Sequence, residues 1–147
     1  MRKILALDCD GVICLLGGTN IDDNRMKLLQ DLVIAVPELE IVLSSDWKLY
    51  DFAKAAIAKK FEEFGIPQII GETPNFEFEE NNFRYKEIQD WIDKNLTPED
   101  RFAIIDDRDD ACIPGFEEFF IQTDEYVGIT PEDVRRMIGI FNNNRNV

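Results

Sequence analysis

Short apolar runs alternate with amphipathic segments along most of the chain, and this alternation limits the possible folds most strongly. Each run is short enough to form a strand that is buried on both faces, and the runs occupy residues 4–7, 41–43, 68–70, 102–105 and 119–121. Helical spacing of apolar residues predicts helices over 25–36, 51–64 and 85–94 and from residue 130. Strands and helices that alternate through short connections form a parallel sheet covered on both faces. We therefore predict an α/β fold, a doubly wound three-layer sandwich with a mainly parallel central sheet.

The length and composition fit one compact unit. The chain has 147 residues, of which 45% are hydrophobic, so we expect a single domain over residues 1–147. The apolar run at 4–7 is too short for the core of a secretory signal, and no stretch approaches the roughly 20 apolar residues of a membrane span. The three cysteines lack the spacing of a disulfide or zinc framework and suit reduced thiols. We expect a cytoplasmic protein without membrane association.

The charged residues exclude several function classes. The formal net charge of −14 opposes strong nonspecific binding to nucleic acid or to anionic membranes. The chain has no histidine, which excludes serine–histidine and cysteine–histidine nucleophiles, phosphohistidine chemistry and histidine-ligated zinc. Any acid–base chemistry must therefore use carboxylates, lysine, tyrosine or cysteine.

Polar pairs follow three of the predicted strands. They are Asp8 and Asp10 after the first run, Ser44 and Ser45 after the second, and Asp106 and Asp107 after the run 102–105. Ligands of parallel sheets bind at the carboxyl ends of the strands. We therefore expect the three pairs to converge at one edge of the sheet.

The converging carboxylates define a possible chemistry. Like charges this close repel and lose hydration when buried, so a cation should lie between them. An all-oxygen set without histidine or thiolate ligands fits Mg²⁺, which also binds phosphoryl oxygens. A carboxylate beside such a metal can attack phosphorus and form an aspartyl-phosphate. The second carboxylate of Asp8 and Asp10 can then protonate the leaving oxygen and later deprotonate water.

These motifs resemble the four motifs of the haloacid dehalogenase (HAD) superfamily of phosphohydrolases. The motifs are AspCysAspGlyVal after the first strand, SerSer after the second, a basic residue at a helix start, and AspAsp after a later strand. The sequences IVLSSDWK, FRYKEIQDWI, FAIIDD and IQTDEYVGITPEDV are similar to the HAD domain of "Swiss Army Knife" RNA repair proteins. The resemblance spans most of the chain and implies a HAD-like Rossmannoid fold.

The resemblance also implies roles for individual residues. Asp8 would be the nucleophile and Asp10 the general acid and base, with the Asp10 backbone carbonyl facing the metal. The phosphate-binding residues would be Ser44, Ser45 and a cation, either Arg84 or its competitor Lys86. The metal ligands would be Asp8, Asp10, Asp106 and Asp107, where Asp107 either binds the metal or orients another ligand.

Two positions depart from the family pattern, and several residues have a simpler interpretation. Asp46 stands where the family has a small residue, and Lys48 where it more commonly has arginine. Ser45 or Asp46 can simply cap the next helix. The same holds for the acidic residues at 109–110, which suit a solvated loop or cap, and Arg84 and Lys86 can be surface cations. Residues 73–83 can form a surface loop or a mobile flap over the site.

The sequence thus predicts a capless, open, magnesium-dependent phosphatase, a phosphoric monoester hydrolase. The segments between the motifs leave no room for a large cap domain. Within the superfamily, this openness accompanies bulky substrates or oligomers in which a neighbour forms a lid. The resemblance favours a nucleotide or the terminal phosphate of a polynucleotide as substrate. Two alternatives remain, a noncatalytic domain that binds phosphate or metal as an interaction surface, and a receiver-like domain phosphorylated at Asp8.

Overall fold

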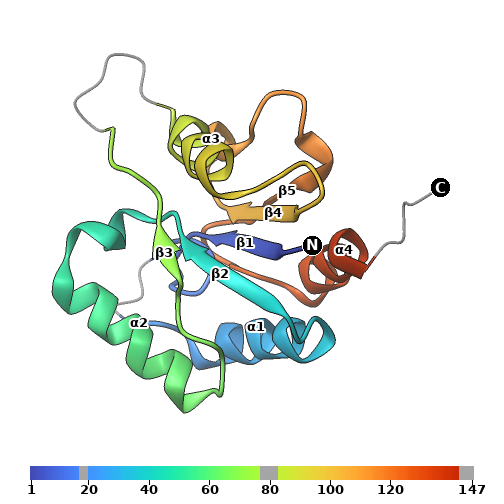
Figure 1. Cartoon of the computed structure of the whole chain (residues 1–147). Coiled ribbons are helices and arrows are strands. Elements are labelled where there is room, and N and C mark those ends of the chain that lie inside the picture. Colours follow the sequence, from blue (N-terminus) through green and yellow to red (C-terminus); the bar gives the residue numbers. More distant parts are fainter. Residues whose placement is uncertain (17–19, 77–82, 143–147) are drawn as a thin grey trace.

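The computed structural model describes residues 1–16, 20–76 and 83–142 and has one parallel sheet at its centre (Figure 1). The sheet has five strands in the order β3-β2-β1-β4-β5, and every neighbouring pair is parallel. The strands are β1 (Lys3–Leu7), β2 (Leu39–Leu43), β3 (Gly71–Glu72), β4 (Arg101–Asp106) and β5 (Phe120–Gln122). The predicted α/β sandwich is confirmed.

Helices cover both faces of this sheet (Figure 1). On one face lie α1 (Asp23–Ala35), α2 (Asp51–Glu63) and α4 (Pro131–Asn142), and on the other lie α3 (Arg84–Asn95) and the 3₁₀ turn η2 (Asp109–Ala111). Side chains of β1 alternate between the two cores, because successive residues of a strand point to opposite faces. Leu5 and Leu7 join the larger core with α1, whereas Ile4 and Ala6 join the smaller core with α3.

Local sequence signals explain the helix ends. Thr130 Oγ1 accepts a hydrogen bond from the Asp133 backbone N–H, and Asp133 Oδ2 accepts one from the Thr130 N–H, so the predicted start of α4 is a reciprocal cap. Helix α1 begins at Asp23, two residues before the predicted start, because the Asp22 side chain caps it.

Two predicted strands are displaced in the structure. The run 68–70 was expected to form a strand, but only its last residue bonds to the sheet: the Ile70 backbone N–H donates to the Ile41 carbonyl of β2 at 2.9 Å, and β3 itself begins at Gly71. The run 119–121 is shifted by one residue, since Phe119 ends the 3₁₀ turn η3 (Glu117–Phe119) and β5 begins at Phe120. Both strands lie at sheet edges, where a strand has only one partner to fix its register.

The register of the central strands brings the functional residues together. Leu7 of β1 is paired with Leu43 of β2 and with Ile105 of β4, so the residues that follow lie side by side. The Ser44 backbone N–H donates to the Leu7 carbonyl at 3.0 Å, and the Asp8 N–H donates to the Ile105 carbonyl at 3.1 Å. The described parts of the connections 8–22 and 73–83 contain no helix and no sheet strand, so this edge carries no cap there.

Two expectations about the chain as a whole concern membranes and thiols. No helix in the described residues is long and apolar enough to cross a membrane. Cys9, Cys14 and Cys112 are all free thiols, and Cys9 is buried.

Candidate active site

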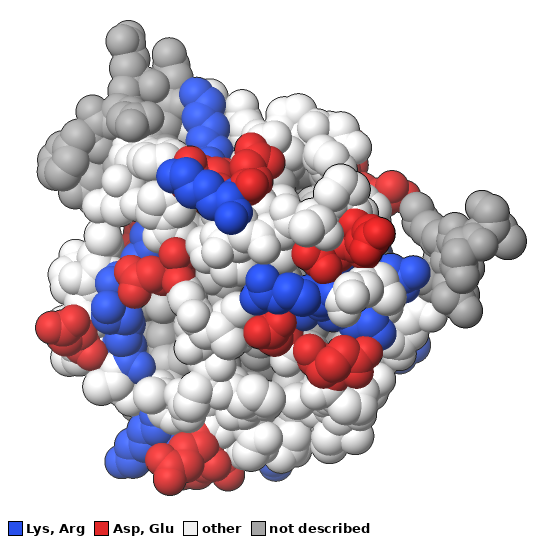
Figure 2. All heavy atoms as spheres, viewed as in Figure 1, with Lys and Arg blue, Asp and Glu red and all other residues white. Residues whose placement is uncertain are grey.

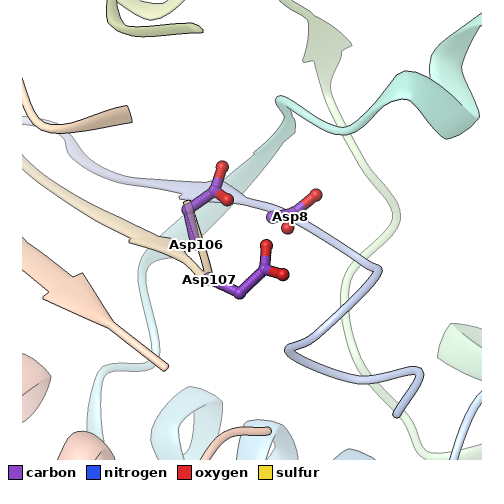
Figure 3. Close-up of side chains that lie close together, drawn as sticks. All are labelled: Asp8, Asp106 and Asp107. Carbon is purple, nitrogen blue, oxygen red and sulfur yellow. The ribbon is translucent and has the colours of Figure 1, made fainter. Parts of the chain in front are cut away.

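Three carboxylates meet where β1 and β4 end (Figure 3). Each of Asp8, Asp106 and Asp107 offers one oxygen, and these oxygens all lie within 4.8 Å of one another. Asp8 is 2% exposed and Asp106 is fully buried, whereas Asp107 is half-buried. The convergence expected from the strand ends is therefore present for these three residues.

Gly11 provides the space in which Asp107 lies. Its φ of +78° lies in the left-handed region that glycine adopts without strain. A Cβ at this position would come within 2.5 Å of the Asp107 carboxyl group. Gly11 therefore allows the turn after Asp10 and also leaves room for the Asp107 side chain.

Arg84 ties two of the carboxylates together. Its Nη1 donates to Asp8 Oδ1 and to Asp106 Oδ2, both at 3.0 Å, and the side chain is only 6% exposed. Arg84 is the first residue of α3, and its backbone N–H donates to Asp110 Oδ2 at 3.1 Å. Its Nη2 also lies 3.5 Å from Asp46 Oδ2, which places the unusual Asp46 beside the site.

The ionisation of this cluster is strongly perturbed. Burial raises the pKa of Asp8 well above its usual value, the Asp106 charge raises it further, and Arg84 opposes both effects. Burial also raises the pKa of Asp106, although Arg84 again acts in the other direction. For Arg84, burial alone would lower the pKa, but Asp106 and Asp8 raise it overall. Arg84 thus lies beside Asp8, Asp106 and Asp46, and the negative charges of the described cluster outnumber its single positive charge.

Two buried oxygens at adjacent strand ends have no hydrogen-bond partner among the described residues. They are Asp8 Oδ2 and Ser44 Oγ. An unpaired buried polar atom costs roughly 1–3 kcal/mol, so such atoms are retained where a ligand completes them. The all-oxygen donors of Asp8, Asp106 and Asp107 suit a hard divalent cation, and a neighbouring phosphoryl group would complete Ser44. The residues present therefore fit Mg²⁺.

The Asp10 carboxylate lies outside this cluster. It is exposed, and its Oδ1 accepts a hydrogen bond from the indole Nε1 of Trp47 at 3.1 Å. The chain turns sharply after Asp8, where the Cys9 carbonyl accepts three backbone N–H groups, and this turn directs Asp10 elsewhere. The predicted metal-ligand role of Asp10 therefore concerns its backbone carbonyl rather than its carboxylate, and it stays a prediction.

Two further candidates are engaged away from the carboxylates. Ser45 Oγ accepts the Trp47 backbone N–H at 3.1 Å and caps the 3₁₀ turn η1 (Asp46–Leu49), whereas α2, the helix that Ser45 or Asp46 was expected to cap, begins without a side-chain cap. Lys86 is exposed, and its Nζ lies over the ring of Phe83 at 5.7 Å from the centroid. The structure brings Arg84, rather than Lys86, to the cluster, and the phosphate-binding roles stay predictions.

The acidic residues after β4 support the site. The Arg108 backbone N–H donates to Asp106 Oδ1 at 3.0 Å. Asp110, besides accepting the Arg84 N–H, is hydrogen-bonded by the Arg108 guanidinium at 2.8 Å and 2.6 Å. Asp110 is thus a cap for α3, one of the interpretations the sequence allowed, and it fixes the position from which Arg84 reaches Asp8.

Sequence reasoning missed a second buried cluster, around Lys48. Lys48 Nζ donates to Thr73 Oγ1 at 2.8 Å, to the Pro74 carbonyl at 3.0 Å and to Glu87 Oε1 at 3.1 Å. The other Glu87 oxygen accepts the Phe76 backbone N–H at 2.8 Å. The position of Glu87 was a sequence signal for this cluster. Glu87 follows Arg84 by three residues, so the two side chains lie on the same side of α3. The flap interpretation of 73–83 falls mainly on residues 77–82, which lie outside the described residues.

Comparison with known proteins identifies the family. A family model described as "HAD domain in Swiss Army Knife RNA repair proteins" matches residues 4–134. No curated protein and no solved structure gives a match. Since the match covers nearly the whole chain and includes the three carboxylates, Ser44 and Arg84, the chain belongs to this HAD domain family, whose chemistry is that of a HAD-type phosphohydrolase.

Proposed function

We propose that the chain is a magnesium-dependent phosphomonoesterase that acts through an aspartyl-phosphate on Asp8, on nucleotides or on the terminal phosphates of nucleic acids. One observation carries this proposal. Asp8 Oδ2 and Ser44 Oγ are both buried, both lack a partner among the described residues, and follow strands that are paired directly. A nucleophile and a hydrogen-bond donor for a phosphoryl group need this arrangement.

The first step is transfer of the phosphoryl group to the protein. Arg84 holds Asp8 Oδ1, which leaves Oδ2 to attack phosphorus. The P–O bond to the leaving group breaks, and Asp10 gives a proton to the leaving oxygen. The Ser44 hydroxyl donates a hydrogen bond to a phosphoryl oxygen.

The second step is hydrolysis of the acyl phosphate. Asp10, now deprotonated, takes a proton from water, and the hydroxide attacks phosphorus. The bond between phosphorus and Asp8 Oδ2 breaks, which restores the carboxylate and releases inorganic phosphate. Because Asp10 catalyses this step, a receiver-like protein with a long-lived phosphoryl group is disfavoured.

The metal would be held by Asp8, Asp106 and Asp107. When bound, Mg²⁺ supplies positive charge that offsets the carboxylates and the phosphoryl oxygens. Burial is the first cause that raises the pKa of Asp8, and positive charge beside Asp8 acts in the opposite direction and favours the carboxylate that attacks phosphorus.

The proposed substrate follows from the open site and the family. The family is named for RNA repair proteins, which supports a nucleotide or a nucleic-acid end. On the face that Figure 2 shows, basic side chains lie beside acidic ones and do not gather into a basic patch. With a net charge of −14, this distribution favours recognition of a single phosphate and disfavours nonspecific binding along a nucleic-acid backbone.

Phosphatase assays test the proposal. The purified protein is incubated with an aryl phosphate, with and without Mg²⁺, and Asp8→Asn serves as the control. Metal-dependent release of phosphate that is lost in the variant supports the proposal and justifies assays on nucleotides and on RNA with 5′ or 3′ phosphates. If none of these substrates is hydrolysed but calorimetry detects binding of Mg²⁺ and phosphate, the chain is the noncatalytic binding domain instead.

A further inference from the structure

We propose that a groove beside Asp10 receives the leaving group of the substrate, and that this leaving group is a single nucleoside whose base packs against Trp47, Tyr50 and Phe52. The inference rests on the proposed function and specifies its substrate class. It selects nucleoside monophosphates over phosphorylated chains.

The groove has a volume of about 1170 Å³, is lined by Asp10 and extends along the whole of α2, as far as Glu63. Its lining includes Asp10, Trp47 and Asp46, and Asp46 lies 3.5 Å from the active-site Arg84. Residues 20–23, at the start of α1, also line it. Small-molecule sites typically measure about 300–1,000 Å³, so the groove has room for a nucleoside.

The role of Asp10 determines what occupies this groove. The group that protonates a leaving oxygen must lie within hydrogen-bond reach of it, and Asp10 lines the groove. The Trp47 indole N–H fixes this carboxylate through its 3.1 Å hydrogen bond. A leaving group in contact with Asp10 therefore extends along Trp47 into the groove.

The groove also offers aromatic surface. Tyr50 is 53% exposed and Phe52 is 78% exposed, and both line the groove. Their ring centroids lie 5.7 Å apart with an angle of 42° between the ring planes, so they form one continuous aromatic surface. Exposed aromatic rings of this kind can stack on the flat ring of a base.

The charges of the groove limit the substrate to one phosphate. Its acidic lining residues outnumber its basic ones, with Asp10, Asp22, Asp23, Asp46 and Glu63 against Lys59 and Lys60. Lys60 is paired with Asp23 at 2.7 Å and with Glu63 at 3.2 Å, which reduces its attraction for an anion. Further phosphates of a polynucleotide would be repelled, whereas carboxylates can accept hydrogen bonds from the amino groups of a base.

The test compares adenosine 5′-monophosphate with ribose 5-phosphate, which has the same phosphate and sugar but no base. The variants are Phe52→Ala and Tyr50→Ala, and the matched control is Tyr126→Ala, an exposed tyrosine outside the groove. We expect each groove variant to lose roughly 5- to 100-fold in kcat/KM for the nucleotide and to keep its value for ribose 5-phosphate. The control variant keeps both values.

Equal losses on both substrates, or no loss on the nucleotide, would overturn the groove assignment while leaving the phosphatase intact. A terminally phosphorylated oligonucleotide that is hydrolysed better than the mononucleotide would also overturn it. Binding of adenosine, measured by calorimetry on the wild-type chain, needs no catalysis and separates the two proposals. Binding that is weakened in Phe52→Ala supports the groove even if no phosphatase activity is found, and no binding at millimolar adenosine contradicts it.

Discussion

Two buried cations sit near the start of α3, and their surroundings differ. Arg84 is hydrogen-bonded to Asp8 and Asp106 at the strand ends, whereas Lys48 is hydrogen-bonded to Glu87 and Thr73. Arg84 and Glu87 are one helical turn apart, so a single helix contributes to both clusters. Both cations are nearly excluded from solvent, at 6% and 4% exposure.

The difference lies in how completely each cluster is paired. The three donors of the Lys48 ammonium group have three acceptors, and both oxygens of Glu87 accept hydrogen bonds. In the Arg84 cluster, negative charge exceeds positive charge and Asp8 Oδ2 has no partner among the described residues. A complete cluster stabilises the fold, whereas an incomplete one can bind and react. This difference favours a structural role for the Lys48 cluster and supports the proposed functional role of the Arg84 cluster.

The largest expected effect is the loss of activity in Asp8→Asn. An amide of the same shape cannot act as the nucleophile, so kcat/KM should fall at least about 10³-fold. The measurement is metal-dependent hydrolysis of an aryl phosphate. Lys48→Met, assayed under conditions where it is folded, should retain far more activity. A variant of Lys48 that is folded but as inactive as Asp8→Asn would erase the distinction between the clusters.

Breaking the complete cluster should affect stability instead. Lys48→Met leaves Glu87 as a buried, unpaired charge, and we expect unfolding to cost about 3–5 kcal/mol less. Urea denaturation measures this change. The double variant Lys48→Met with Glu87→Leu should recover part of the loss, because no charge then stays buried. A double variant that is less stable than the single one would argue against this pairing.

Removing the Asp8 charge from the Arg84 cluster should raise the stability of the fold, whereas Lys48→Met lowers it. Burial raises the pKa of Asp8, so the folded state binds its proton more tightly than the unfolded state does. The stability that this tighter proton binding contributes is fully present below about 3.8, the pKa of Asp8 in the unfolded chain. It is lost as pH rises through the raised pKa of the folded state. At neutral pH without metal, the wild type has lost this contribution, whereas Asp8→Asn carries no buried charge at this position. It should gain on the order of 1 kcal/mol, or about 2–4 °C in Tm.

Thermal unfolding in a chelator, followed over pH, measures this gain. The advantage of Asp8→Asn should shrink toward acid pH, where the wild-type carboxyl group is protonated. Added Mg²⁺ should raise the Tm of the wild type more than that of the variant. If the wild type is the more stable protein at neutral pH without metal, the site does not lack positive charge.

The two neighbouring serines give the smallest and most closely matched comparison. Ser45 caps η1, so Ser45→Ala should cost about 1 kcal/mol of stability with little change in kcat. Ser44 has a buried hydroxyl without a partner, so Ser44→Ala should leave stability unchanged or slightly higher and lower the activity. Denaturation and kinetics on both variants check the pair. A reversed pattern would assign phosphate binding to Ser45.

The sequence was sufficient for the features that depend on short-range patterns. Apolar runs gave the parallel sheet, and the polar residues after β1, β2 and β4 met at one edge because parallel strands end together. The edge strands were displaced because a single partner and neighbouring turns decide their register, as β5 shows by beginning only after the turn η3 ends.

Side-chain partners were harder to predict than strand ends. Asp10 follows Asp8 by two residues, yet the turn at Cys9 and the bond from Trp47 direct it away from the cluster. Lys48, which stands where the family more commonly has arginine, is paired with Glu87, which is 39 residues away in sequence. The contact between Lys48 and Glu87 depends on how α3 packs against the segment after β2, which the helical spacing of Glu87 does not specify.

The most direct test of the account is to trap the phosphoryl group on the protein. Asp10→Asn should still accept a phosphoryl group from an aryl phosphate but hydrolyse it slowly, because the base that activates water is lost. After rapid acid quenching, mass spectrometry of the peptides should find one phosphoryl group, on Asp8, and none when Asp8→Asn is added to the variant. A phosphoryl group on another residue, or turnover by the wild type that persists in Asp8→Asn, would contradict the account.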